Sequence, residues 1–173
     1  MNELALASFA AANDAHLVGE PRSARFAAFK AAFDVRTELA RLSALGFRFL
    51  ARSDAAFPPL LRAIHDPPPG LFLRGDAETA LLARPAVAVV GARACSAYGR
   101  QVARSLGRDL AAAGLVVVSG LARGVDAEAH RGALEAEGAT VAVLGCGVDR
   151  DYPAAHRELA RLIAATGLIA SEY

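Results

Sequence analysis

The sequence of 173 residues has no tryptophan, one lysine, one methionine and only two cysteines. Two cysteines, Cys95 and Cys146, are too few for a disulfide framework, which favours a reducing, cytoplasmic location. No apolar run reaches the roughly 18 to 20 residues that a membrane-spanning helix needs, so we expect no membrane partner. Residues 1–12 are apolar but contain Glu3 and lack a basic region, which argues against a signal peptide.

The residues that are abundant are aliphatic. Hydrophobic residues make up 54% of the chain and charged residues 21%, which indicates a packed globular protein with a core of Val, Leu and Phe. The net charge is +1, yet the stretch from Arg84 to Arg131 contains seven arginines and three carboxylates. These arginines either lie on solvated faces of helices or contact a ligand. Arg93 and Arg123 differ from the others because they lie in predicted turns.

The pattern of apolar residues predicts an α/β fold. Residues 1–45 predict a small N-terminal helical region with Ser23 as a helix cap, and residues 46–173 a Rossmann-like domain that begins with short strands at 47–50 and 71–74. Later strands are apolar on both faces and alternate with helices, which favours a parallel sheet with helices on both faces. The doubly wound rule predicts the strand order 3-2-1-4 for these later strands. They are residues 87–90, 115–118, 140–144 and 168–170.

The first predicted turn is residues 91–99, between a strand and a helix. Gly91 permits a tight turn, and Ser96 is placed either to cap the helix or to donate its hydroxyl to a phosphate. Arg93 offers a fork of donors that suits a phosphodiester. The alternative is that Arg93 pairs with a carboxylate at the edge of the sheet.

The second predicted turn is residues 119–126, which carry two glycines and a second cation, Arg123. We predict that Asp126 caps the next helix by accepting hydrogen bonds from backbone amides. His130 lies one helical turn further along the same face. Because two residues make neither a metal site nor a catalytic dyad, we expect His130 to hydrogen-bond to a neighbouring loop.

The third predicted turn is residues 145–153, with Pro153 at the start of a helix. Tyr152 either presents its ring to a nucleobase or packs into the core. The sequence contains no Ser-His-Asp order, HExxH motif, CxxC pair or Walker turn. We therefore expect no catalytic residue, no metal and no cofactor.

Several short motifs follow one another between residues 46 and 173. They are Phe57-Pro58-Pro59-Leu60-Leu61, Asp66-Pro67-Pro68, Leu73-Arg74-Gly75-Asp76, Val89-Val90-Gly91-Ala92-Arg93, Ser96-Ala97-Tyr98-Gly99, Ser119-Gly120-Leu121-Ala122-Arg123-Gly124-Val125-Asp126, Ala129-His130-Arg131-Gly132-Ala133-Leu134, Ala142-Val143-Leu144-Gly145-Cys146-Gly147-Val148-Asp149, Tyr152-Pro153 and Ser171-Glu172-Tyr173. In this order and spacing they resemble the motifs of the DNA-processing protein A family (DprA, also called Smf).

The resemblance implies an extended Rossmann fold that binds single-stranded DNA without catalysing a reaction on it. Such proteins protect incoming strands during natural transformation and load the RecA recombinase. In the family, basic residues of the first and second turns contact the DNA, and Arg93 and Arg123 hold those positions here. Family members form homodimers through a part of the sheet that follows the Ser-Glu-Tyr motif, where this chain stops. We therefore expect a truncated Rossmann domain that is monomeric or weakly associating, with an exposed edge strand near Leu168.

The predicted site is a phosphate-binding surface for DNA. Its binding residues are Gly91, Arg93, Ser96, Gly99, Ser119, Gly120, Arg123 and Gly124, and its supporting residues are Asp126, His130 and Tyr152. The alternative function is a Rossmann-like nucleotide-binding sensor or a nucleotide hydrolase, although the Pro-Gly-Gly…Glu stretch typical of such hydrolases is absent. A further alternative is a scaffold whose pocket is vestigial.

Overall fold

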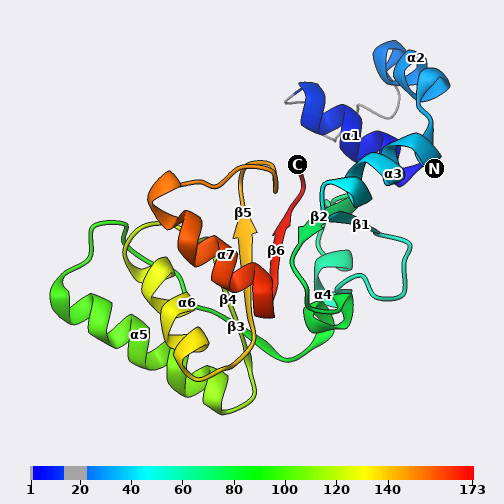
Figure 1. Ribbon diagram of the computed structural model, residues 1–173. Coiled ribbons are helices and arrows are strands. Elements are labelled where there is room, and N and C mark those ends of the chain that lie inside the picture. The colour runs from blue at the N-terminus through cyan, green and yellow to red at the C-terminus, as the bar shows by residue number, and fades with distance from the viewer. Residues whose placement is uncertain (1, 14–22) are drawn as a thin grey trace.

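The computed structural model describes residues 2–13 and 23–173, which form a group of N-terminal helices, a mixed sheet and a layer of longer helices (Figure 1). The helices are α1 (Glu3–Asn13), α2 (Ala24–Ala32), α3 (Val35–Ala44), α4 (Pro59–Arg62), α5 (Ala97–Ala112), α6 (Val125–Glu135) and α7 (Arg157–Thr166), with the 3-10 helices η2 (Thr79–Ala83) and η3 (Ala154–His156). The strands are β1 (Phe47–Ala51), β2 (Gly70–Arg74), β3 (Ala86–Ala88), β4 (Val116–Ser119), β5 (Thr140–Leu144) and β6 (Leu168–Ser171).

The six strands form one sheet in the order β1-β2-β6-β5-β4-β3. The strands β6, β5, β4 and β3 are parallel to one another, which confirms the predicted parallel arrangement. β2 is antiparallel both to β1 and to β6, so the hairpin of β1 and β2 extends the sheet beyond β6. The result is the Rossmann-like α/β architecture that the sequence predicts.

The predicted strand order 3-2-1-4 is wrong, because the parallel strands follow one another in chain order. β3 suits an edge of the sheet: its two alanines are exposed, and it follows Pro85, which has no amide to donate. β6 is buried along its whole length and needs a neighbour on both sides, which β5 and β2 supply. Leu168 therefore lies inside the sheet, and the expectation of an exposed edge there is also wrong.

The helices α5, α6 and α7 cover one face of the sheet, whereas we expected helices on both faces (Figure 1). Right-handed crossovers that all move in the same direction place their helices on the same side. In β4, Val117 packs against this helical layer, and Val116 points to the opposite face. That face is covered instead by the segment around α4 and η2, through Phe57 and Leu81.

The N-terminal helices pack against the sheet at β2. Leu4 of α1 and Leu42 of α3 share a buried cluster with Phe72 of β2 and Val148 of the third turn. The prediction of helices for this region is confirmed in the described residues, and Ser23 caps α2 by accepting a hydrogen bond from the Phe26 amide at 3.0 Å. The rest of the predicted helical region, residues 1 and 14–22, lies outside the described residues. The division into domains at residue 45 stays a prediction.

None of the helices within residues 2–13 and 23–173 is both long enough and apolar enough to cross a bilayer.

Candidate functional site

The three predicted turns lie at one edge of the sheet, where the parallel strands β3, β4 and β5 end (Figure 1). Residues 89–96 connect β3 to α5, residues 120–124 connect β4 to α6, and residues 145–153 connect β5 to η3 and α7. In open parallel sheets this carboxyl edge is where ligands bind. The fold therefore brings the predicted site residues to one surface.

The first and second turns are in direct backbone contact. The Val125 amide donates to the Ala92 carbonyl oxygen at 3.3 Å. Gly124 has a φ of +80°, and a Cβ at this position would collide with the carbonyl oxygens of Ala92 and Arg93. Only glycine combines this backbone conformation with so close an approach. The contact fixes the turn that carries Arg123 against the turn that carries Arg93.

The prediction that Asp126 caps α6 is wrong, because the residue at the cap position is Gly124. The Asp126 carboxylate instead accepts hydrogen bonds from the Gly120 amide at 3.1 Å and from the Gly91 amide at 3.4 Å. Its place in the first turn of α6 faces the ends of β3 and β4, and both glycine amides lie beyond the last residues of these strands. Asp126 is 6% exposed, so it joins the two turns from below the surface.

A second set of buried polar groups lies beneath the turns. The Ser119 hydroxyl donates to the Val89 carbonyl oxygen at 2.6 Å, which leaves this predicted binding residue below the surface with its proton used internally. The Thr140 hydroxyl donates to the Val117 carbonyl oxygen at 2.7 Å. Because its one proton is used there, Thr140 must accept the hydrogen bond that joins it to Nδ1 of His130, also at 2.7 Å.

His130 is fully buried, and its Thr140 partner is the first residue of β5. The expectation that it bonds to a loop is therefore wrong. Burial lowers the pKa of His130 to about 4, although the Asp126 carboxylate and the Ser119 backbone oppose this shift. Among the described residues, no group of three or more His, Cys, Asp or Glu side chains is placed to bind a metal ion.

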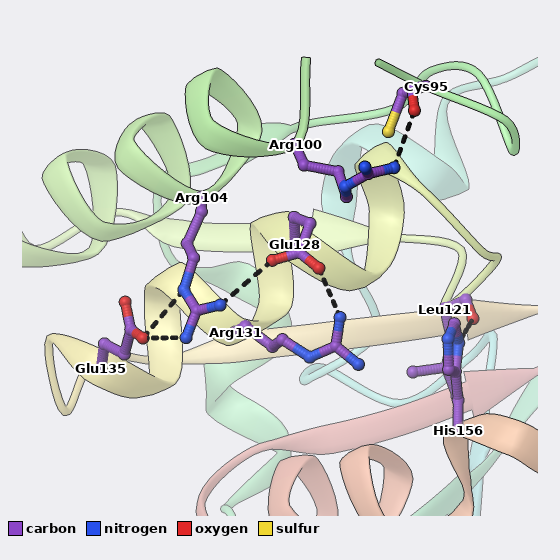
Figure 2. Close-up of polar contacts among 8 residues, drawn as sticks. All are labelled: Cys95, Arg100, Arg104, Leu121, Glu128, Arg131, Glu135 and His156. Carbon is purple, nitrogen blue, oxygen red and sulfur yellow. Dashed lines mark hydrogen bonds and ion pairs between the residues drawn. The ribbon is translucent and has the colours of Figure 1, made fainter. Parts of the chain in front are cut away.

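His156 is a supporting residue that sequence reasoning missed. Its Nδ1 lies 2.9 Å from the carbonyl oxygen of Leu121 in the second turn (Figure 2). Leu121 is buried and has a φ of +58°, a left-handed conformation that is uncommon outside glycine. The interaction anchors the start of the second turn from η3. No local pattern could have revealed it, because the two residues are far apart in the sequence.

Arg93 and Arg123 lie on the exposed surface above these buried groups. Neither side chain makes a hydrogen bond or an ion pair with the described part of the chain, so the alternative pairing of Arg93 with a carboxylate is not found there. Ser96 is also exposed, and its Oγ caps α5 by accepting a hydrogen bond from the Gly99 amide at 3.1 Å. Tyr152 is 64% exposed, so the alternative that it packs into the core is wrong.

The other arginines of the basic stretch each contact an oxygen of the protein. They are Arg84, Arg100, Arg104, Arg108 and Arg131. Arg104 of α5 bonds to Glu135 and Glu128 of α6, and Arg131 bonds to the same Glu128 (Figure 2). The hydrogen bond from Arg104 lowers the pKa of Glu135. These five cations bond within the protein, and Arg104 joins α5 to α6, whereas Arg93 and Arg123 face solvent.

The third turn forms one wall of a cleft of about 620 Å³ whose other wall is α1 and α3. Arg150 of the turn and Arg41 of α3 both line the cleft. No local sequence pattern predicts this cleft, because it forms only where helices that precede the sheet in the chain pack next to the end of β5.

Residues 48–173 match the family model described as DNA recombination-mediator protein A. Over 128 residues the chain is 42% identical to Protein Smf of Synechocystis sp., covering 73% of this chain and 32% of that protein. It is similar to the X-ray structure of DNA processing protein A from Streptococcus pneumoniae, with a TM-score of 0.72, 37% identity and coverage of 86% of this chain and 50% of that one.

A second solved relative is DNA processing protein A from Helicobacter pylori, a structure described for its single-stranded DNA binding mode. The TM-score is 0.64 at 37% identity, covering 73% of this chain and 55% of that one. The chain thus spans about a third to a half of the length of these relatives. The family match extends over most of the chain, in the region that contains all three turns. The chain belongs to the DNA recombination-mediator protein A family, as the motifs had predicted.

Proposed function

We propose that this chain binds single-stranded DNA by its phosphates, along the edge formed by the first and second turns, and catalyses no reaction on it. The observation that carries the proposal is the contrast among the arginines. Five of the seven in the basic stretch contact the protein, whereas Arg93 and Arg123 are exposed at neighbouring strand ends without a partner in the described residues. A pair of free guanidinium groups on a fixed backbone suits a chain of phosphates.

The backbone of the same turns supports the proposal. Gly91, Gly120 and Gly124 allow close approach, and the N-terminus of α5, the positive end of its helix dipole, points toward this edge. Gly99 and Ser96 shape the start of α5. Asp126 and His130, with Ser119, hold the turns from beneath. We assign Tyr152 a stacking role, since its ring is exposed beside the third turn.

The finer part of the proposal concerns the biological role. We infer that the whole protein protects incoming single strands and loads RecA in recombination, the role that membership of the family suggests. The two solved relatives are named DNA processing protein A, and the one from Helicobacter pylori is described for its single-stranded DNA binding mode. A strand-exchange assay with RecA, with and without this chain, tests that role separately from binding.

Binding itself is tested by titrating a labelled oligo-dT at two salt concentrations. Each phosphate neutralised on a single strand contributes about 0.7 to the log–log slope of affinity against salt. We expect Arg93→Ala and Arg123→Ala each to weaken binding and to lower this slope by roughly one contact. Arg108→Ala is the matched control, because Arg108 lies on the surface of α5 and bonds to Asp109.

Two results would contradict the proposal. One is that both turn variants bind oligo-dT with the affinity and salt slope of the parent. The other is that a mononucleotide competes with oligo-dT at similar concentrations, which would favour a nucleotide sensor. Turnover of that mononucleotide would point to the hydrolase alternative.

A further inference from the structure

The cleft beside the third turn has walls that are fixed relative to each other. One wall is residues 145–150, and the other is the facing surface of α1 and α3. Leu42 of α3 and Val148 of the turn belong to the same buried cluster, so the two walls share a core at the bottom of the cleft. The cleft volume of about 620 Å³ lies within the range of small-molecule sites.

The lining of the cleft is apolar below and polar at the rim. Leu42, Phe47 and Phe72 provide the apolar surface. Arg150 at the rim is exposed and its side chain has no hydrogen bond or ion pair within the described residues, while Asp149 supplies an acceptor. A nucleobase has the matching chemistry, because its faces are apolar and its edges carry donors and acceptors.

The cleft also continues the edge that carries the free arginines. β5, which ends at the third turn, pairs with β4, which ends at the turn of Arg123. Adjacent strands lie about 4.8 Å apart, so the third turn is the next step along the edge from Arg123. Figure 1 shows the three turns in sequence along this edge, with α1 and α3 beyond them. A strand bound at Arg93 and Arg123 that follows the edge arrives at the cleft.

We propose that this cleft is a nucleobase subsite that receives a base of the single strand whose phosphates bind Arg93 and Arg123. The inference rests on the proposed function and adds a second kind of contact to it. One wall, α1 and α3, precedes the family-matched residues 48–173. The subsite therefore gives the N-terminal helices a part in binding that the matched domain does not supply alone.

The experiment compares oligo-dT with an abasic oligonucleotide of equal length, which keeps the phosphates and removes the bases. Ala11→Trp fills the cleft from α1, where Ala11 is exposed and lines it. Ala27→Trp is the matched control, an exposed alanine of α2 outside the cleft lining. Arg150→Ala tests the rim with a side chain that makes no hydrogen bond or ion pair within residues 2–13 and 23–173.

We expect the cleft to contribute about tenfold to the parent's preference for oligo-dT over the abasic strand, the effect of one stacked base, in addition to the stacking on Tyr152. Ala11→Trp should remove the contribution of the cleft and leave both the affinity for the abasic strand and the salt slope unchanged. Arg150→Ala should reduce the affinity for oligo-dT by roughly fivefold. Ala27→Trp should behave as the parent.

The subsite is overturned if the parent binds the two strands equally, or if Ala11→Trp and Arg150→Ala both retain the parent's preference. Loss of binding in Arg93→Ala together with unchanged cleft variants would leave the proposed function standing and remove the subsite alone. A parent that binds neither strand would remove both.

Discussion

The carboxyl edge of the sheet has two levels that use polar residues in opposite ways. In the lower level, Asp126, Ser119 and Thr140 are buried and form their hydrogen bonds with the chain itself. In the upper level, Arg93 and Arg123 are exposed and form none within the described residues. The lower level fixes the backbone, and the upper level leaves its donors open to solvent. A preorganised binding surface needs both properties, because ordering it during binding would reduce the affinity.

The largest expected effect in the lower level is a pH dependence of stability. Buried His130 has its pKa lowered to about 4 from 6.5, so in the folded protein it stays neutral where an unfolded chain takes up a proton. The free energy of unfolding should therefore fall as the pH drops from 6.5 toward 4, by about 3 kcal/mol in total from this residue. The nearby Asp126 carboxylate raises the pKa of His130 and the nearby His156 ring lowers it, but both effects are smaller than that of burial.

Urea unfolding between pH 4.5 and 7.5 measures this dependence. His130→Gln should flatten the profile over that range, since glutamine does not titrate. The control is His65→Gln, which changes an exposed histidine and should keep the parent's profile. An unchanged slope in the His130 variant would mean that other groups cause the acid sensitivity.

An intermediate effect is expected from Asp126→Asn, which links the two levels. The amide keeps the shape of the side chain but has only one acceptor oxygen for the amides of Gly91 and Gly120. We expect a loss of stability of about 1–3 kcal/mol, together with weaker oligo-dT binding because both turns shift. Thermal unfolding and the DNA titration measure the two effects.

The matched control for that variant is Asp109→Asn, an exposed carboxylate of α5 whose one side-chain partner in the described part of the chain is Arg108. It should change neither stability nor binding. If Asp126→Asn lost stability and bound DNA like the parent, the lower level would have no part in positioning the arginines.

The smallest expected effects on stability separate the arginines themselves. Arg93→Ala and Arg123→Ala remove exposed side chains without partners, so the free energy of unfolding should change by less than about 0.5 kcal/mol. Arg104→Ala breaks bonds to Glu135 and Glu128, yet Arg104 is half exposed, so its cost should stay below about 1 kcal/mol.

The loss of oligo-dT affinity should rank these variants in the opposite order to the loss of stability. Arg93→Ala and Arg123→Ala should bind more weakly, and Arg104→Ala should bind oligo-dT as the parent does. The same protein samples serve for chemical unfolding and for titration, so the two orders can be compared directly. A turn variant that lost stability as well as binding would show that its arginine has a structural role after all.

Local sequence patterns were sufficient to locate the strands and the two turns that contain Arg93 and Arg123. The run at 140–144 coincides with β5, because an apolar stretch between glycines has few other ways to fold. Arg93 and Arg123 could be selected because each follows a glycine turn at the end of an apolar strand. Position in the chain is enough to place both arginines at the same edge of the sheet, since all parallel strands end there.

Properties that depend on distant contacts could not be predicted. The strand order depends on the pairing of β2 with β6. No residue pattern in the later strands indicates this pairing. Asp126 looked like a helix cap because its own neighbours in sequence suggest one, yet its partners are Gly91 and Gly120. The cleft needs α3 and the third turn to share a core, a contact between segments about a hundred residues apart.

The antiparallel pairing of β2 with β6 also determines how cooperatively the protein unfolds. Phe72 of β2 lies opposite Ser171 of β6, so an early strand of the sheet is joined to the last one. If β6 unfolds, the β1–β2 hairpin loses its pairing with the rest of the sheet. If the hairpin unfolds, β6 loses one of its two neighbouring strands. Calorimetry should accordingly record one cooperative transition for the hairpin and the parallel strands together, and two resolved transitions would contradict this coupling.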